Sequence, residues 1–75
     1  MNDLRTVINI NDKYSFMTEL FRGNMKAYND FIVQLNDIAN RSEAMSLVEA
    51  TAEQYHWDND SLAVRNFYKV FDKKF

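Results

Sequence analysis

The stretch YHWDNDS at residues 55–61 holds the only histidine and the only tryptophan of the chain, together with two closely spaced aspartates. A calcium loop of the EF-hand type needs oxygen ligands at its first, third and fifth positions, glycine at the sixth and glutamate at the twelfth. Asp58 and Asp60 suit the first two positions, but Leu62 and Ala63 occupy the next two and no glutamate ends the loop. We therefore expect a helix start, capped by Asp58 or Asp60, with Trp57 packing inward against a residue such as Leu62.

The histidine and the nearby carboxylates do not complete a catalytic site in the sequence. His56 could act as a general base oriented by Asp58 or Glu53, but no nucleophile lies beside it. Glu43, Glu49 and Glu53 could share a metal ion, but a di-metal carboxylate bundle needs Glu-x-x-His motifs, which this chain lacks. We expect no catalytic residues, no metal and no cofactor, and so a protein that is not an enzyme.

Helices are the elements expected to carry these residues. The 75-residue chain has no proline and one glycine, too few turn-forming residues for a fold rich in β-structure. Hydrophobic residues make up 47% of the chain, which is too many for a disordered segment, and the absence of cysteine excludes disulfides. The sequence predicts one all-α domain over residues 1–75, a compact bundle of four helices.

Polar residues and the single glycine divide the predicted helices. Asn11 or Asp12 is expected to cap a first helix that runs to about Arg22, and Gly23 suits the left-handed residue that follows a helix. Asn24 is the expected cap of a second helix.

Two more boundaries follow further along the chain. Asn40, with Ser42 as the alternative, is the expected cap of the third helix, and a fourth helix is expected to start between Asp58 and Ser61. The first ten residues form either a short extra helical turn or an arm that reaches for a partner.

The aromatic content predicts a contact surface. Six phenylalanines, four tyrosines and one tryptophan offer more apolar area than a small domain is expected to hide completely. We therefore predict a protein-interaction or assembly module, which binds a partner protein or a second copy of itself. The residues predicted to make this contact are Tyr14, Phe21, Phe71 and Phe75.

Charge and hydropathy limit the other partner classes. The net charge is −2 and the basic residues are scattered, so nucleic acid is not the favoured partner. The alternative function is a small DNA-associated regulator of helix-turn-helix type, which would turn at Gly23 and gather Arg22, Lys26 and Arg41 on one face. Apolar runs such as residues 31–33 are far too short to span a bilayer, so we expect no membrane insertion, and we favour a cytoplasmic location.

Polar, aromatic and glycine residues follow a characteristic order between residues 10 and 75. They are Asn11, Asp12, Phe16, Glu19, Leu20, Phe21, Gly23, Asn24, Tyr28, Asn29, Glu43, Ala44, Tyr55, Trp57, Asp58 and Phe75. This order resembles a short helical module of uncharacterised proteins from Bacteroidetes-type bacteria. The resemblance implies no activity, and it implies a C-terminal domain of a longer, sometimes membrane-associated protein. The chain departs from that module at Asp72, Lys73 and Lys74, where the module has a pair of arginines.

Overall fold

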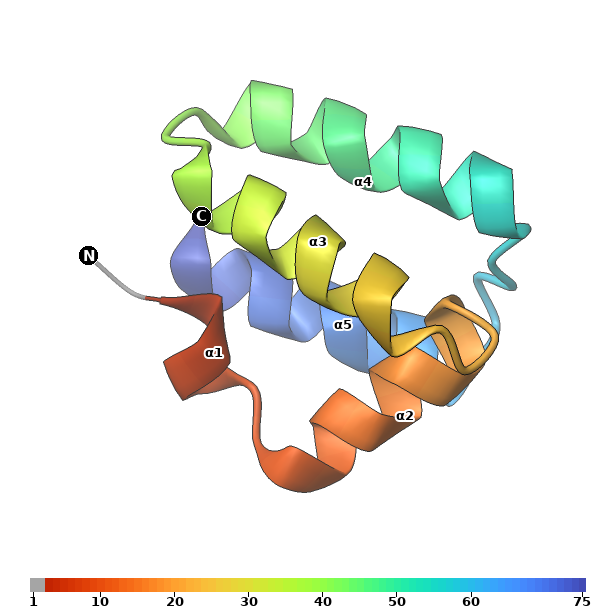
Figure 1. Ribbon diagram of the computed structural model, residues 1–75. Helices are drawn as coiled ribbons and strands as arrows, with labels where there is room; N and C mark the ends of the chain where they lie inside the picture. Colours follow the sequence, from red (N-terminus) through yellow and green to blue (C-terminus); the bar gives the residue numbers. More distant parts are fainter. Residues whose placement is uncertain (1–2) are drawn as a thin grey trace.

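Five α-helices follow one another in the computed structural model, which describes residues 3–75 (Figure 1). They are α1 (Leu4–Val7), α2 (Ile10–Leu20), α3 (Met25–Asp37), α4 (Arg41–Tyr55) and α5 (Leu62–Lys74). The all-α prediction is confirmed, with four longer helices and one short N-terminal helix. Figure 1 shows α4 running along one side of α3, with α5 behind α3 and α2 on the other side.

Asparagine is the N-cap residue of three of the described helices. The Asn24 side chain accepts a hydrogen bond from the Ala27 amide, and the Asn40 side chain accepts from two amides of the first turn of α4. Both caps were predicted, because capping depends on residues next to the boundary. The cap of α2 was predicted wrongly: Asn9, not Asn11 or Asp12, accepts from the Asp12 amide at 2.8 Å.

The turn between α2 and α3 uses two left-handed residues. Gly23 has φ +82°, as predicted, and Arg22 before it has φ +55°. The Gly23 amide donates to the Met17 carbonyl at 3.0 Å, which closes the end of α2. This turn brings α3 back beside α2, so that the two helices form neighbouring walls of one surface.

The N-terminal segment is a helix that joins the core. Leu4 is fully buried, and α1 packs against both α3 and α5. The Leu4 amide donates to the side-chain oxygen of Asn36 in α3 at 2.9 Å, and the Asn36 side-chain amide donates to Asp3 at 2.9 Å. The short-helix alternative for the first ten residues is therefore correct for the part of them that the structure describes.

The core lies where α5 meets α2, α3 and the inner face of α4. Phe67 of α5 contacts Phe16 of α2 edge to face, with ring centroids 5.7 Å apart. Large side chains dominate this interior, which gives a short chain enough buried apolar area to fold. The buried hydrophobic residues are Leu4, Ile8, Phe16, Leu20, Phe21, Tyr28, Phe31, Ile32, Leu35, Ala44, Val48, Ala63, Val64, Phe67, Val70 and Phe71.

Trp57 joins the α4–α5 connection to this core, as predicted. Its indole lies edge-on to Phe21, Phe31 and Phe67, and its Nε1 donates to the Leu20 carbonyl at 2.9 Å. The packing partner suggested from sequence was wrong, because Leu62 is 71% exposed.

Candidate interaction surface

The four aromatic residues predicted to contact a partner occupy different environments. Tyr14 of α2 is 52% exposed and stays available at the surface. Phe21 and Phe71 are 2% and 0% exposed, so the contact role predicted for them has to be corrected to a role in the core. Both lie on helical stripes that face other helices of the same chain, and the spacing of a stripe does not tell what covers it.

Phe75 packs back onto its own helix. Its ring centroid lies 4.8 Å from that of Phe71, and the Lys74 ammonium lies 5.4 Å from its ring centroid. The residue is half-buried, so it offers a partner much less area than a free terminal aromatic would.

Four large apolar side chains are exposed on α2 and α3. Ile10 and Tyr14 are 67% and 52% exposed and lie one turn apart on α2. Met25 and Val33 of α3 are 42% and 50% exposed. Ile10 is not among the predicted contact residues, because the sequence places it in an N-terminal segment of uncertain structure, whereas it is the first residue of α2.

A groove of about 260 Å³ lies between α1, α2 and α3, and we call it the α1–α3 groove. Its apolar lining comes from one residue after α1 and two of α3, and Val33 is both a lining residue and half exposed. The full lining consists of Arg5, Ile8, Lys13, Tyr28, Asn29, Ile32 and Val33.

The polar groups of the α1–α3 groove are all able to donate hydrogen bonds. Arg5 is bound to Asp3, with Nη2 2.9 Å from one carboxylate oxygen and Nε 3.2 Å from the other. The side-chain ammonium of Lys13 makes no ion pair or hydrogen bond within residues 3–75. Burial, and to a lesser degree the negative charge of Asp12, raises the pKa of Tyr28 to about 12, so its hydroxyl keeps its proton at neutral pH.

A family model described as "Domain of unknown function (DUF8457)" matches residues 5–75. This chain belongs to that family. No curated protein and no solved structure matches the chain. Membership agrees with the uncharacterised module that the sequence resembles, and its Bacteroidetes source remains a prediction.

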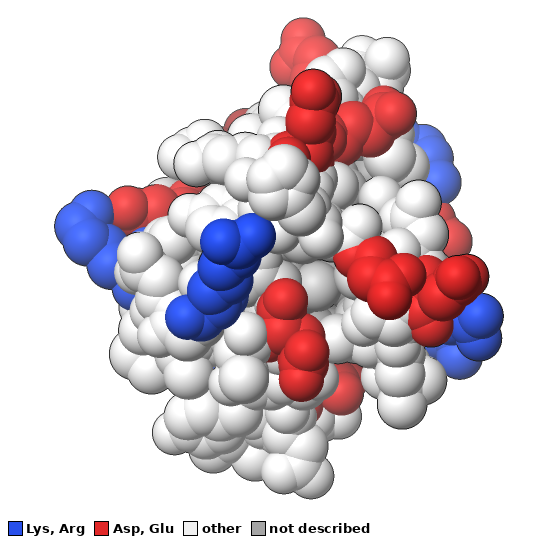
Figure 2. All heavy atoms as spheres, turned by 90° about the vertical axis from the view of Figure 1, so that its right-hand side faces the viewer, with Lys and Arg blue, Asp and Glu red and all other residues white. Residues whose placement is uncertain are grey.

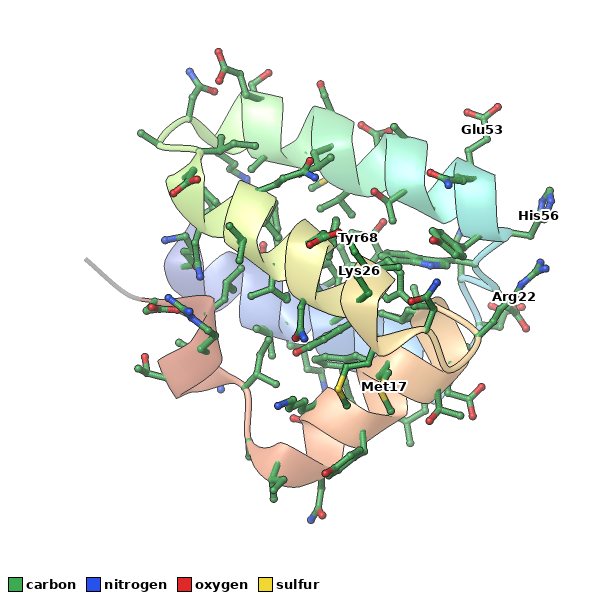
Figure 3. All side chains as sticks on the ribbon, in the orientation of Figure 1. Met17, Arg22, Lys26, Glu53, His56 and Tyr68 are labelled. Carbon is green, nitrogen blue, oxygen red and sulfur yellow. The ribbon has the colours of Figure 1, made fainter. Side chains whose placement is uncertain are left out.

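Residues 55–61 of this DUF8457 member, which hold His56, Asp58 and Asp60, form the end of α4 and the turn that follows it. His56 has φ +55° and its amide hydrogen-bonds to the carbonyls of the last turn of α4, so it is a left-handed C-cap residue. Figure 3 shows the His56 and Glu53 side chains pointing away from the body in different directions. Asp58 accepts from the Asp60 amide at 2.9 Å within this turn. The next helix, α5, starts at Leu62 with Ser61 as its N-cap, so the predicted cap, Asp58 or Asp60, is wrong; Ser61 makes no side-chain capping hydrogen bond. Within residues 3–75 no three His, Asp or Glu side chains gather as metal ligands.

The basic residues of this DUF8457 member do not form one face. Lys26 is paired with Asp30 and Arg41 with Asp72, each at 2.8 Å. Arg22 lies at the α2–α3 turn, whereas Arg41 begins α4 at the opposite end of the molecule (Figures 1 and 3). Figure 2 shows mainly acidic side chains at the end that carries this turn. In the part of the chain that the structure describes, no helix is long and apolar enough to cross a membrane.

Proposed function

We propose that this DUF8457 domain is a non-catalytic protein-interaction module, with the α1–α3 groove and its apolar flanks as the contact surface. The observation that carries the proposal is the α1–α3 groove with the half-exposed Val33 in its lining, together with Ile10 and Tyr14, which are exposed on α2, the helix that supplies Lys13 to that lining. Ten of the eleven aromatic side chains are buried or half-buried, and Tyr14 is the exception. Large apolar side chains that stay exposed around a depression are typical of protein contact sites.

The surface fits a partner protein better than it fits nucleic acid. In the helix-turn-helix alternative, α3 would read DNA, yet its Lys26 is neutralised by Asp30 and its Asp37 is exposed. A DNA reader needs basic side chains directed at phosphates, and no observation favours that function for this chain.

The wider setting also belongs to the proposal. A cysteine-free chain fits a reducing cytoplasm, so we propose a cytoplasmic location in a bacterial cell. We propose that the domain is the C-terminal part of a longer protein, as the resemblance described above implies.

Photo-crosslinking in cells of the source organism tests the proposed surface. The photoreactive amino acid benzoylphenylalanine replaces Tyr14 in one variant and Glu49, exposed on α4, in a matched control. We expect one discrete crosslinked product from position 14, none from position 49, and loss of that product when Val33→Asp is added. Equal or diffuse products from both positions, or none from either, would contradict the proposal.

A further inference from the structure

We infer that the α1–α3 groove binds an acidic amphipathic helix of a partner protein, with its apolar side chains in the groove and its carboxylates near Lys13. The inference rests on the proposed function, because it names the partner chemistry of the same surface. Two observations carry it: the shape and apolar flanks of the groove, and the donor groups that line it.

The size of the groove favours protein side chains over a small molecule. Its volume of about 260 Å³ is below the range of about 300–1,000 Å³ that holds typical ligands. One or two apolar side chains of a partner fit this space and rest on Ile8 and Ile32, which are almost completely buried.

The walls of the groove favour a helix as the partner segment. α3 supplies Ile32 and the half-exposed Val33 to the groove, and α2 supplies Lys13; Ile10 and Tyr14 are exposed on α2 outside the lining. A partner helix with apolar residues three and four positions apart can place one of them in the groove and pack another against Val33. A peptide that binds by strand addition would need the open edge of a β-sheet, and residues 3–75 offer helices and turns instead.

The charge of the lining favours acidic flanks on that helix. The groove is lined by Arg5 and Lys13 and by no carboxylate. The side-chain ammonium of Lys13 has no ion-pair or hydrogen-bond partner among residues 3–75, so it can receive a carboxylate of the partner. Arg5 is already paired with Asp3 and adds hydrogen-bond donors but no net charge. The Tyr28 hydroxyl adds a protonated donor, while the nearby Asp12 acts against an approaching anion.

Two peptides that differ only in charge test this inference by NMR titration of the whole ¹⁵N-labelled chain. Both probes are acetylated and amidated fourteen-residue helices with leucines three and four positions apart. The flanking residues are glutamates in one probe and lysines in the other. We expect the glutamate probe to shift the amides of Ile8, Lys13, Asn29 and Val33 and to bind at least about fivefold tighter than the lysine probe, with an affinity that falls as salt rises.

Lys13→Glu and Lys69→Glu form the matched pair of variants, because each changes the net charge equally and Lys69 is exposed on α5, outside the groove. We expect Lys13→Glu to weaken binding of the glutamate probe about tenfold and to favour the lysine probe, whereas Lys69→Glu stays within about twofold of the unchanged chain. Asp12→Asn should strengthen binding of the glutamate probe about twofold, since it removes the opposing charge.

Three results would overturn the inference. Equal binding of both probes in the groove would reject the acidic partner and leave the proposed interaction function standing. Shifts outside the groove, or none with either probe, would reject the groove as the helix site, and the crosslinking experiment would then decide the proposed function separately. Groove amides that shift with protein concentration alone would identify a second copy of the chain as the occupant.

Discussion

Phe21 is the residue at which α2, α3 and α4 meet. Its ring centroid lies 6.0 Å from that of Tyr28, 5.3 Å from that of Phe31 and 5.0 Å from that of Tyr55. Tyr14 lies in α2, the helix that Phe21 caps at its C-terminal end, and about half of its surface is exposed to solvent. The two aromatics therefore differ in what they contribute: one stabilises the fold, and the other is free to contact a partner.

Replacing each of these two residues by leucine should separate the roles. Phe21→Leu should lower the free energy of unfolding by about 1–2 kcal/mol, because it leaves a void among packed rings. Tyr14→Leu should change it by less than about 0.5 kcal/mol, as is usual for an exposed position. Urea denaturation followed by circular dichroism measures both values, and similar losses in the two variants would contradict this assignment.

At the same scale, residues that act through their neighbours in sequence could be predicted, and residues that act through distant contacts could not. The caps Asn24 and Asn40 and the left-handed Gly23 depend on local hydrogen bonds and on local φ, which sequence shows. The burial of Phe21 and Phe71 depends on which helix covers them. Of the four residues predicted to contact a partner, Tyr14 is exposed, and its contact role stays a prediction. The α1–α3 groove could not be predicted, because a groove built from three helices has no local signature.

At the scale of elements, α1 is held by one buried residue and a small polar network. Leu4 enters the core, while Asp3 binds Arg5 and accepts a hydrogen bond from Asn36 of α3. The hydrogen bonds from Arg5 lower the pKa of Asp3 to about 2 from a usual value of 3.8, with a smaller contribution from Asn36. The folded state therefore favours the charged carboxylate, so its stabilisation of α1 is present above about pH 4 and is lost as the pH falls toward 2.

Acid should accordingly loosen α1 before the rest of the fold. Between pH 5 and pH 2 we expect the amides of Leu4 and Arg5 to lose protection from hydrogen exchange while the Phe67 amide in α5 stays protected. Asp3→Asn is the control, because it removes the titrating group and should make the protection of the α1 amides independent of pH in this range. Simultaneous loss of protection in α1 and α5 would show that α1 is not a separate unit.

At the scale of the whole molecule, the accessible surface and the radius of gyration are those of a compact folded monomer. The accessible surface is 4,900 Å², close to the value of about 4,800 Å² expected for a folded monomer of this mass. The radius of gyration is 11.2 Å, and a compact chain of 75 residues is expected to have about 11 Å. Most of the aromatic side chains that the composition led us to expect at the surface are therefore buried inside the fold, which weakens the argument for self-association.

This chain should consequently be a monomer that unfolds in one cooperative step. Light scattering over a hundredfold dilution should give the mass of 8.9 kDa throughout. The reason is that few apolar residues are exposed on the face that carries the α1–α3 groove, and that the polar residues Lys13 and Asn29 lie within it. The thermal midpoint should not change with protein concentration, since an equilibrium that does not involve association has no concentration dependence. A mass that rises toward 17.8 kDa, twice 8.9 kDa, together with a rising midpoint would instead show that this face pairs with itself. A constant mass would leave the same face open for a different protein.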